Sequence, residues 1–458
     1  MKAHLFLPIV LLTGCTLGPD FSLPGFDAGK NFKQPSSSRA TRIPDAWWTL
    51  FNDPELTRLT NKAIAANNDL AAARARRDTA RALVGVDRAR LFPRLDLNSN
   101  NGISRISGDN NFPGVKLENQ NYRTTFNLSY DADLWGANRR RVEAAEATAN
   151  SADRLLDSQR LGIATEVARQ YFILRALDAQ ENVLRETINS RGEALQIETS
   201  REEAGISDSL ATSRAKTEVE LAKNDLAFVQ RQRGSAANAL AVLCGSTPVS
   251  FNVSGKISAS KLPSISPGLP AEVLARRPDV RAAEQNLRAA SARIGIAEAA
   301  FYPDISLTGS AGLESLTAGN FLDWQSRVLS LGAGLTAPLL DAGANRANYD
   351  ASRSSYDESL ANYRQALLIA LREVEDALVD LQGLSRSMKA LDAAKESALD
   401  TRRLSQSRYD QGISSYLEVV DADRSVLSIR LALAELDGQQ KVSLAALVQA
   451  LGGGWSGK

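Results

Sequence analysis

Histidine, cysteine and methionine are nearly absent from this chain. Its 458 residues include one histidine, His4, and two cysteines, Cys15 and Cys244. With no histidine beyond His4, catalytic triads that use histidine and zinc sites with histidine ligands are excluded, and so is a disulfide framework. Cys244 lies at the apolar end of an expected helix, and we interpret it as a packed thiol. No phosphate loop or metal-ligand spacing stands out, so we expect no cofactor and no enzymatic activity.

Long apolar runs and an excess of charge of one sign are also missing. No apolar run approaches the roughly 18–20 residues that a transmembrane helix needs. The formal net charge of +1 gives no reason to expect nucleic acid as a partner. With 43% apolar and 23% charged residues, the composition is that of an ordinary folded protein, long enough for more than one domain.

Proline is absent between Pro113 and Pro248, and again from Leu339 to the end of the chain. The first of these stretches consists mostly of Ala, Leu, Glu, Arg, Gln and Lys, which favour helices. From Asn138 to Ala204 no helix stop stronger than a single glycine occurs, which predicts a rod on the order of 100 Å at about 1.5 Å per residue. A rod of this length cannot bury itself in one core and must pack against other rods.

The predicted rod breaks at Ala204-Gly205-Ile206-Ser207. Gly205 can adopt the left-handed conformation that ends a helix, and Ser207 can cap the returning helix. About 207 residues further on, Gly412-Ile413-Ser414 repeats this turn. Both turns are therefore expected to be the ends of helical hairpins.

The whole unit occurs twice. Ala137-Asn138-Arg139 recurs as Ala344-Asn345-Arg346, and upstream, Phe92-Pro93 recurs as Tyr302-Pro303. The shift changes from about 210 residues upstream to about 207 downstream, which places the length difference in the segments between. We interpret those segments as loops that tolerate changes in length. The duplication predicts an architecture of two similar halves.

Two pairs of segments change to an alternating pattern. In the stretch from Tyr122 to Leu134 every second residue from Phe126 on is apolar, the partner strand begins at Leu95, and residues 305–313 and 329–337 alternate in a similar way. Half-apolar strands of about 9–13 residues have the length and pattern of outer-membrane barrel strands. The turns between them, near residues 108–113 and 317–323, are polar and contain glycine, so we expect them to face solvent.

Four such strands cannot close a barrel by themselves. In lipid every backbone N–H and C=O must be paired, so an open sheet is excluded and the two hairpins would have to meet copies of themselves. The alternative is a small soluble sandwich of four strands, whose polar faces would also need to be covered.

The N-terminus has the features of a targeting segment. Lys2 supplies the positive charge, residues 5–12 are apolar, and Leu12-Thr13-Gly14-Cys15 places small residues before a cysteine. This resembles a bacterial lipoprotein signal, in which Cys15 is lipidated; the alternative is an ordinary secretory signal. Thr16 in place of Asp indicates, by analogy, delivery to the outer membrane. One acyl chain anchors weakly, so the lipid would supplement another membrane attachment.

An arm and a first helix follow this segment. Residues 16–42 hold Gly, Pro and Ser clusters without periodicity and are expected to be extended. Asp53 is predicted to cap a helix that begins at Pro54. Trp47 and Trp48 are interpreted as packing the arm onto the helical body, with a binding platform as the alternative.

Taken together, these residues resemble the TolC-like outer-membrane efflux family and its lipoprotein branch, the outer membrane factors. The resemblance covers nearly the whole chain. It is carried by the lipoprotein signal and by these motifs: Gly18-Pro19-Asp20-Phe21, Trp47-Trp48, Phe51-x-Asp53-Pro54-x-Leu56, Gly268-Leu269-Pro270, Arg276-Arg277-Pro278-Asp279, Phe301-Tyr302-Pro303 and Ala450-Leu451-Gly452-Gly453-Gly454-Trp455.

The resemblance implies a mainly α fold with a membrane β-barrel. In it, a homotrimer shares one twelve-stranded barrel, to which each subunit gives four strands, and the long antiparallel helices of two tandem repeats form an α-barrel across the periplasm. The domains expected are a signal peptide at 1–14, a lipidated arm and first helix at 15–66, a first repeat at 67–250, a linker at 251–276 and a second repeat at 277–458. The strands are expected near 93–105, 121–134, 303–314 and 326–338, and the long helices near 136–204, 207–244, 342–411 and 414–451.

The function that the resemblance implies is passive. The protein would be the outer-membrane exit duct of a tripartite efflux pump of the resistance-nodulation-division type, in a Gram-negative bacterium and anchored through Cys15. Drugs and small toxic compounds would reach it from an inner-membrane pump through a periplasmic adaptor. Type I protein secretion by the same fold is an alternative, as is a lipid-anchored periplasmic coiled-coil scaffold. The lipoprotein signal favours efflux, and the membrane-type strands argue against the scaffold.

The resemblance also places a periplasmic gate in residues 412–424. Leu417, Asp421 and Arg424 are spaced four and three apart, so they share one side of a helix. By resemblance, Asp421 from three subunits would form an acidic ring and Leu417 an apolar one, with Glu418 at a second acidic position. Like charges a few Å apart repel by roughly 2–3 kcal/mol per pair at an effective dielectric near 20, so other contacts must hold the gate closed. Without the resemblance, Asp421 and Arg424 read as an ordinary surface pair.

Those other contacts would form a latch near the second turn. Tyr409 matches a latch tyrosine of the family, but the next position, which is basic in the family, is Asp410 here. Arg408 or Arg201 is the candidate substitute. The turns Gly205-Ile206-Ser207 and Gly412-Ile413-Ser414 would then be the helix tips that contact the adaptor, an expectation that rests on their position alone.

Overall fold

A computed structural model describes residues 15–33, 41–105, 107, 109, 118–253 and 262–454. The expected signal peptide, most of the turn near residues 108–113 and Trp455 lie outside the described residues. The chain divides into two compact units. The strand unit takes in the chain up to Gly25, Arg76–Asp153 and Ala282–Arg364, and the tip unit takes in Phe26–Ala75, Arg154–Arg281 and the chain from Gln365.

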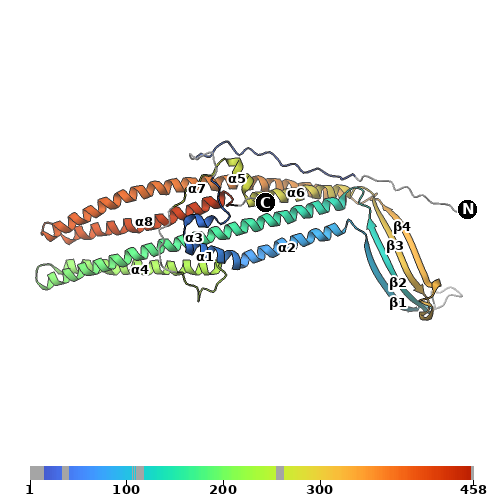
Figure 1. Cartoon of the computed structure of the whole chain (residues 1–458), viewed down its shortest axis with the longest axis horizontal. Coiled ribbons are helices and arrows are strands. Elements are labelled where there is room, and N and C mark those ends of the chain that lie inside the picture. The colour runs from blue at the N-terminus through green and yellow to red at the C-terminus, as the bar shows by residue number, and fades with distance from the viewer. Residues whose placement is uncertain are drawn as a thin grey trace. The chain divides into compact units, whose positions relative to one another are not determined.

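Helices and strands follow one another in two similar series (Figure 1). They are α1 (Pro54–Ala66), α2 (Asn68–Ala89), β1 (Arg94–Arg105), β2 (Glu118–Asp131), α3 (Ala137–Glu203), α4 (Ser209–Leu243), α5 (Pro270–Arg276), α6 (Pro278–Ala299), β3 (Asp304–Ser315), β4 (Arg327–Thr336), α7 (Ala344–Asp410) and α8 (Tyr416–Ala450). Short 3₁₀ turns lie at η1 (Trp47–Phe51), η3 (Ala318–Asn320) and η4 (Trp324–Ser326).

The duplication in the sequence is a duplication of elements. The helices α3 and α7 each have 67 residues, and α4 and α8 each have 35. In the same way α2 and α6 each have 22 residues, and β1 and β3 each have 12. Each compact unit contains segments from both copies of the repeat. The compact units are therefore not the two tandem repeats, and the division of the chain into repeat domains stays a prediction from the duplicated sequence. None of the helices among the described residues has a stretch both long and apolar enough to cross a membrane.

The strand unit holds one antiparallel sheet in the order β1-β2-β3-β4. The register places apolar residues opposite one another across all four strands, as in the row Leu97, Phe126, Ala311 and Leu329. Leu329 is 77% exposed, so the described part of the chain leaves the apolar face uncovered there. The alternating apolar residues predicted from the sequence therefore form one continuous apolar face of the sheet.

The opposite face of the sheet is polar. The neighbouring row consists of Asp96, Asn127, Ser310 and Ser330. Among the described residues, β1 and β4 each have only one hydrogen-bonded neighbour, so in this part of the chain both outer edges of the sheet keep unpaired backbone groups.

The turn between β3 and β4 is only partly as expected. It is exposed, but it carries the exposed apolar side chains of Leu316, Leu322 and Trp324, so the prediction of a polar turn is wrong in this respect. Two 3₁₀ turns and the hydrogen bond from Ser326 Oγ to the Asn320 carbonyl (2.6 Å) hold the loop in shape. The 3₁₀ turns themselves are closed by backbone bonds, from Phe321 to the Ala318 carbonyl and from Ser326 to the Asp323 carbonyl, which need no particular side chains at the tip.

In the tip unit, one apolar core joins the first helix to the long helices. Asp53 caps α1 by accepting hydrogen bonds from the N–H groups of Glu55 and Leu56, as predicted. Trp47 and Trp48 are buried in this core, which confirms their structural interpretation.

The remaining cysteine also belongs to this core. The Cys244 side chain is buried, and its Sγ donates to the Leu59 carbonyl at 3.5 Å. Burial raises the pKa of the thiol above its usual value. The prediction of a packed thiol is therefore confirmed.

Candidate gate at the helix tips

The first hairpin turn joins α3 to α4. Gly205 has a φ of +70°, the left-handed conformation predicted for it. The N–H of Ile206 donates to the Arg201 carbonyl at 2.8 Å, and the N–H of Gly205 donates to the Glu202 carbonyl at 2.9 Å. These two bonds satisfy the last carbonyl groups of α3 and reverse the chain within a few residues.

The predicted cap of the returning helix is wrong by one residue. Asp208 is the N-cap of α4, and its carboxylate accepts from the N–H of Ala211 at 3.1 Å. Ser207 instead lies with its Oγ 3.4 Å from the Glu198 carboxylate, to which it donates. The turn uses one residue more than we allowed, because the bonds that end α3 extend to Ile206 and Ser207.

The second turn repeats the first. Gly412 has a φ of +72°, its N–H donates to the Tyr409 carbonyl at 2.9 Å, and the N–H of Ile413 donates to the Arg408 carbonyl at 2.9 Å. Ile206 and Ile413 are both exposed at the ends of their hairpins. Ser414 precedes the N-cap of α8, and its Oγ is buried with no hydrogen-bond partner among the described residues.

The first turns of α8 separate an apolar side from an exposed side. Tyr416, Val419 and Val420 are buried against Ala211 and Ala215 of α4. The four predicted gate residues of α8 all lie on the exposed side: Leu417, Glu418, Asp421 and Arg424. The structure therefore brings them together on one face, as their spacing requires.

The carboxylate of Glu198 on α3 joins the two hairpins. Glu198 is only 2% exposed, and the hydroxyl of Tyr409 on α7 donates to it at 2.5 Å. Arg201 lies 3.2 Å from Glu198, 5.1 Å above the Tyr409 ring and 3.5 Å from Asp410. Of the two candidate substitutes, Arg201 is thus the one that contacts Tyr409 and Asp410, whereas Arg408 lies 3.8 Å from Glu418.

A second buried carboxylate, Glu218 on α4, joins the hairpins again. Glu218 is 4% exposed, and Arg191 of α3 lies 3.0 Å from it. Arg424 of α8 donates to the same carboxylate from Nε at 2.9 Å and from a second nitrogen. Asp421 is further from Arg424, at 3.7 Å, so the main partner of Arg424 lies on the other hairpin.

Burial and these contacts shift several pKa values. Burial raises the pKa of Tyr416 to about 12. Burial and the hydrogen bond to Glu198 raise the pKa of Tyr409. The hydrogen bond to Glu218 raises the pKa of Arg424. At neutral pH Tyr409 therefore stays a neutral donor to Glu198 and Arg424 stays charged, which suits a set of contacts that hold two hairpins together.

Glu198 and Glu218 were not identified from the sequence. One local feature of the sequence could have identified Glu218. It falls between Ala215, Val219 and Ala222, at a position where the helical pattern predicts an apolar residue. A carboxylate on a buried stripe needs a partner, and each of these two has one on the other hairpin, Tyr409 for Glu198 and Arg424 for Glu218. The spacing along one helix cannot name them.

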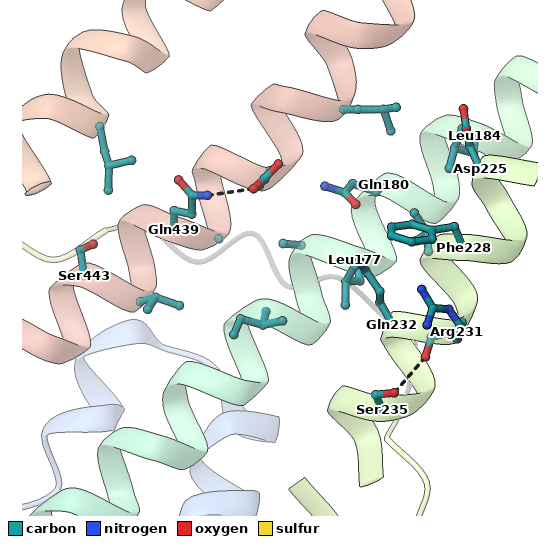
Figure 2. Close-up of a pocket in the computed structure, with 18 of the residues that line it drawn as sticks. Leu177, Gln180, Leu184, Asp225, Phe228, Arg231, Gln232, Ser235, Gln439 and Ser443 are labelled. Carbon is teal, nitrogen blue, oxygen red and sulfur yellow. Dashed lines mark hydrogen bonds between the residues drawn. The ribbon is translucent and has the colours of Figure 1, made fainter. Parts of the chain in front are cut away.

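A wider groove lies further along the same helices, between α3, α4, α7 and α8 (Figure 2). Its volume is about 980 Å³. Leu177, Leu184 and Phe228 give it an apolar wall, and Figure 2 shows Gln439 and Ser443 of α8 on the other side. Phe228 is half exposed, so the side chains of the described residues do not fill the groove.

Cys15 lies in the strand unit and is exposed. The residues that follow it are held by the start of α3: Leu17 donates its N–H to the Trp135 carbonyl at 3.1 Å, and Arg140 donates to the carbonyls of Leu17 at 3.0 Å and Gly18 at 3.1 Å. Arg140 is buried, so the arm is fixed close behind Cys15.

Comparison with known proteins places this arrangement in a family. The family model described as "Outer membrane efflux protein" matches residues 59–246 and 269–453. The chain belongs to the outer membrane efflux protein family. The two matched stretches of this outer membrane efflux protein contain both helical hairpins and all four strands.

Individual relatives of this outer membrane efflux protein extend over its whole length. It is 33% identical over 457 residues to the solvent efflux pump outer membrane protein SrpC of Pseudomonas putida, covering 98% of this chain and 97% of the relative. It is 31% identical to the cation efflux system protein CusC of Escherichia coli, covering 98% of each chain. A crystal structure of a membrane protein from Pseudomonas aeruginosa matches with a TM-score of 0.89 and 30% identity, over 96% of this chain and 98% of that one.

Proposed function

We propose that this chain is the exit duct of a tripartite efflux pump in the outer membrane of a Gram-negative bacterium. The observation that carries the proposal is the full-length match to outer-membrane efflux proteins. The family consists of outer-membrane efflux proteins, so the activity proposed is passive conduction rather than catalysis. The names of two relatives refer to solvents and to cations, so the shared fold accepts different cargoes and cannot by itself identify one.

The sheet supports a membrane position closed by trimer formation. Its apolar face is exposed across all four strands, and its opposite face is polar. In lipid the free edges of β1 and β4 must be paired. Three copies that pair β4 of one with β1 of the next would close a barrel of twelve strands, with the apolar face toward lipid and the polar face toward the duct.

The helix tips support a gate that opens toward the periplasm. Asp421 and Leu417 are exposed on the side of α8 that its own chain leaves uncovered. Tyr409 with Glu198 and Arg424 with Glu218 would act as latches that hold the hairpins together while the Asp421 side chains of three subunits repel one another. Release of these contacts would let the hairpins move apart.

The proposed exit duct also implies its partners. An inner-membrane pump of the resistance-nodulation-division type and a periplasmic adaptor would supply cargo, and the exposed turns at Ile206 and Ile413 are the proposed adaptor contacts. Lipid on Cys15 would add a second membrane attachment, since the arm behind it is fixed to the strand unit by Arg140.

The test is single-channel conductance of the purified full chain in a planar bilayer. We expect steady pores of low conductance and cation preference. Conductance should rise and cation preference should fall in Asp421→Ala. The matched control Asp437→Ala removes one exposed aspartate from the same helix, away from the tip, and should change neither. Cys15→Ser should still form pores. A well-folded trimer without conductance would rule out the duct.

A further inference from the structure

A small pocket with three arginines lies between α3, α7 and α8, within the tip unit. Its volume is about 160 Å³, and it is distinct from the wide groove of Figure 2. Arg191 of α3, Arg402 of α7 and Arg430 of α8 line it. Each arginine comes from a different helix, so a ligand bound among them would contact all three helices at once.

The pocket carries a positive charge. Its lining contains two carboxylates, Glu186 and Asp423, against the three arginines, which leaves one positive charge in excess. Glu218 lies outside the lining and pairs with both Arg191 and Arg424. Burial raises the pKa of Asp423, and Arg402 and Arg191 oppose this shift.

Arg191 has an unused donor in this pocket. The side chain is 6% exposed, and its Nη1 is taken by Glu218, at 2.9 Å from the carbonyl and 3.0 Å from the carboxylate. Its Nη2 is buried, and no acceptor among the described residues lies within hydrogen-bond distance. A buried guanidinium N–H without an acceptor is costly, so a group with lone pairs is favoured beside it.

The other two arginines are held in place by their carboxylates. Arg402 pairs through Nε with Asp423 at 2.5 Å and donates from Nη2 to Ser190 Oγ at 3.4 Å. Arg430 donates from Nη2 to Glu186 at 2.5 Å. These bonds use one or two nitrogens of each group, and a guanidinium has five N–H donors in a fixed plane. The arginines are therefore oriented in advance, with donors left for a ligand.

We propose that this pocket binds a small oxyanion of the size of phosphate. Arginine favours oxyanions because its planar donors match two oxygens at once. The volume suffices for such an ion with a water molecule or two, each water taking about 30 Å³. The bound ion would satisfy Arg191 Nη2 and neutralise the excess charge.

The consequence of binding follows from the three helices that the pocket joins. An ion that binds only when α3, α7 and α8 are together stabilises that arrangement and no other. The oxyanion is thus a ligand of the closed tips, separate from the cargo that passes through the duct. Its site would occur once in each subunit.

The experiment is calorimetric titration of the full chain in detergent with inorganic phosphate, at an ionic strength kept constant with chloride. We expect saturable binding, and Arg402→Gln should weaken it by about tenfold or more, the usual effect of losing one charged donor. Arg408→Gln is the matched control. It also removes one charge from α7 and one partner of a carboxylate, but it lies outside the pocket and should leave binding unchanged.

Three results would overturn the proposal: no saturable binding of phosphate or sulfate, an equal response to chloride at the same ionic strength, or equal loss in both variants. If Arg402→Gln does not fold, Arg430→Gln replaces it, because Arg430 is one-third exposed and tolerates substitution better. Pore formation is measured separately, so loss of anion binding and failure of the duct are distinguishable.

Discussion

The hydroxyl of Tyr409 offers the sharpest test of the latch. Tyr409→Phe removes one hydrogen bond, to the buried carboxylate of Glu198, and keeps the ring that Arg201 contacts. A hydrogen bond to a charged group contributes about 1.5–3 kcal/mol, more so when its loss leaves a buried group short of a partner. Arg201 at 3.2 Å and Ser207 at 3.4 Å stay in place, so we expect the lower end of this range.

Loss of the hydrogen bond between Tyr409 and Glu198 is expected to change gating. About 1.5 kcal/mol per subunit shifts the balance between joined and separated hairpins roughly tenfold. In the proposed trimer the change is present three times, so the open probability in a planar bilayer should rise clearly while the conductance of the open state stays the same. The measurement is single-channel recording at neutral pH, where Tyr409 is neutral in either state because its pKa is raised.

The structure provides a matched control for this substitution. Tyr171 also donates its hydroxyl to a carboxylate, that of Asp53 at 2.8 Å, in the core of the tip unit and away from the turns. Tyr171→Phe should lower the thermal midpoint without raising the open probability. If Tyr409→Phe leaves gating unchanged, or if both variants open the pore equally, the latch is not at Glu198.

Three further predictions concern the same tips. Arg424→Gln should raise the open probability, since it removes the partner on α8 from the buried Glu218, and a normal closed state in single-channel recording would refute this. Tyr416 has a pKa of about 12 in the folded protein against an ordinary 10.0, so its contribution to folding stability is fully present below pH 10 and falls as the pH rises toward 12. In alkaline unfolding curves, Tyr416→Phe should make the fall of stability with pH less steep, and an unchanged slope would contradict this. Gly205→Ala should cost about 1 kcal/mol because φ is +70°, whereas Gly192→Ala, inside α3 with open space around it, should be neutral or stabilising by thermal melting.

The sequence was most informative where structure depends on local pattern. The proline-free run and the turn at Gly205 predicted a long helical hairpin, and the duplication predicted a second one at Gly412. Alternation predicted the strands and their apolar face. These features depend on backbone propensity and on the period of apolar residues, both of which a single chain displays.

It was least informative where residues from different hairpins meet. The pairing of Tyr409 with Glu198, and of Arg424 with Glu218, depends on how α3 and α4 pack against α7 and α8. The choice of Arg201 over Arg408 beside Asp410 depends on the same geometry. No spacing within one helix carries this information, because the partners are about 200 residues apart and become neighbours only when the helices pack.

The uncovered sheet has a consequence for the life of the chain before assembly. A single subunit presents an apolar face and two unpaired edges at once, which is the surface that non-native strand pairing requires. In the proposed trimer, correct pairing with two sister chains would compete with aggregation through any other strand. In that trimer, a newly exported subunit would therefore have to be escorted or inserted quickly, and its survival would depend on the concentration of its own copies.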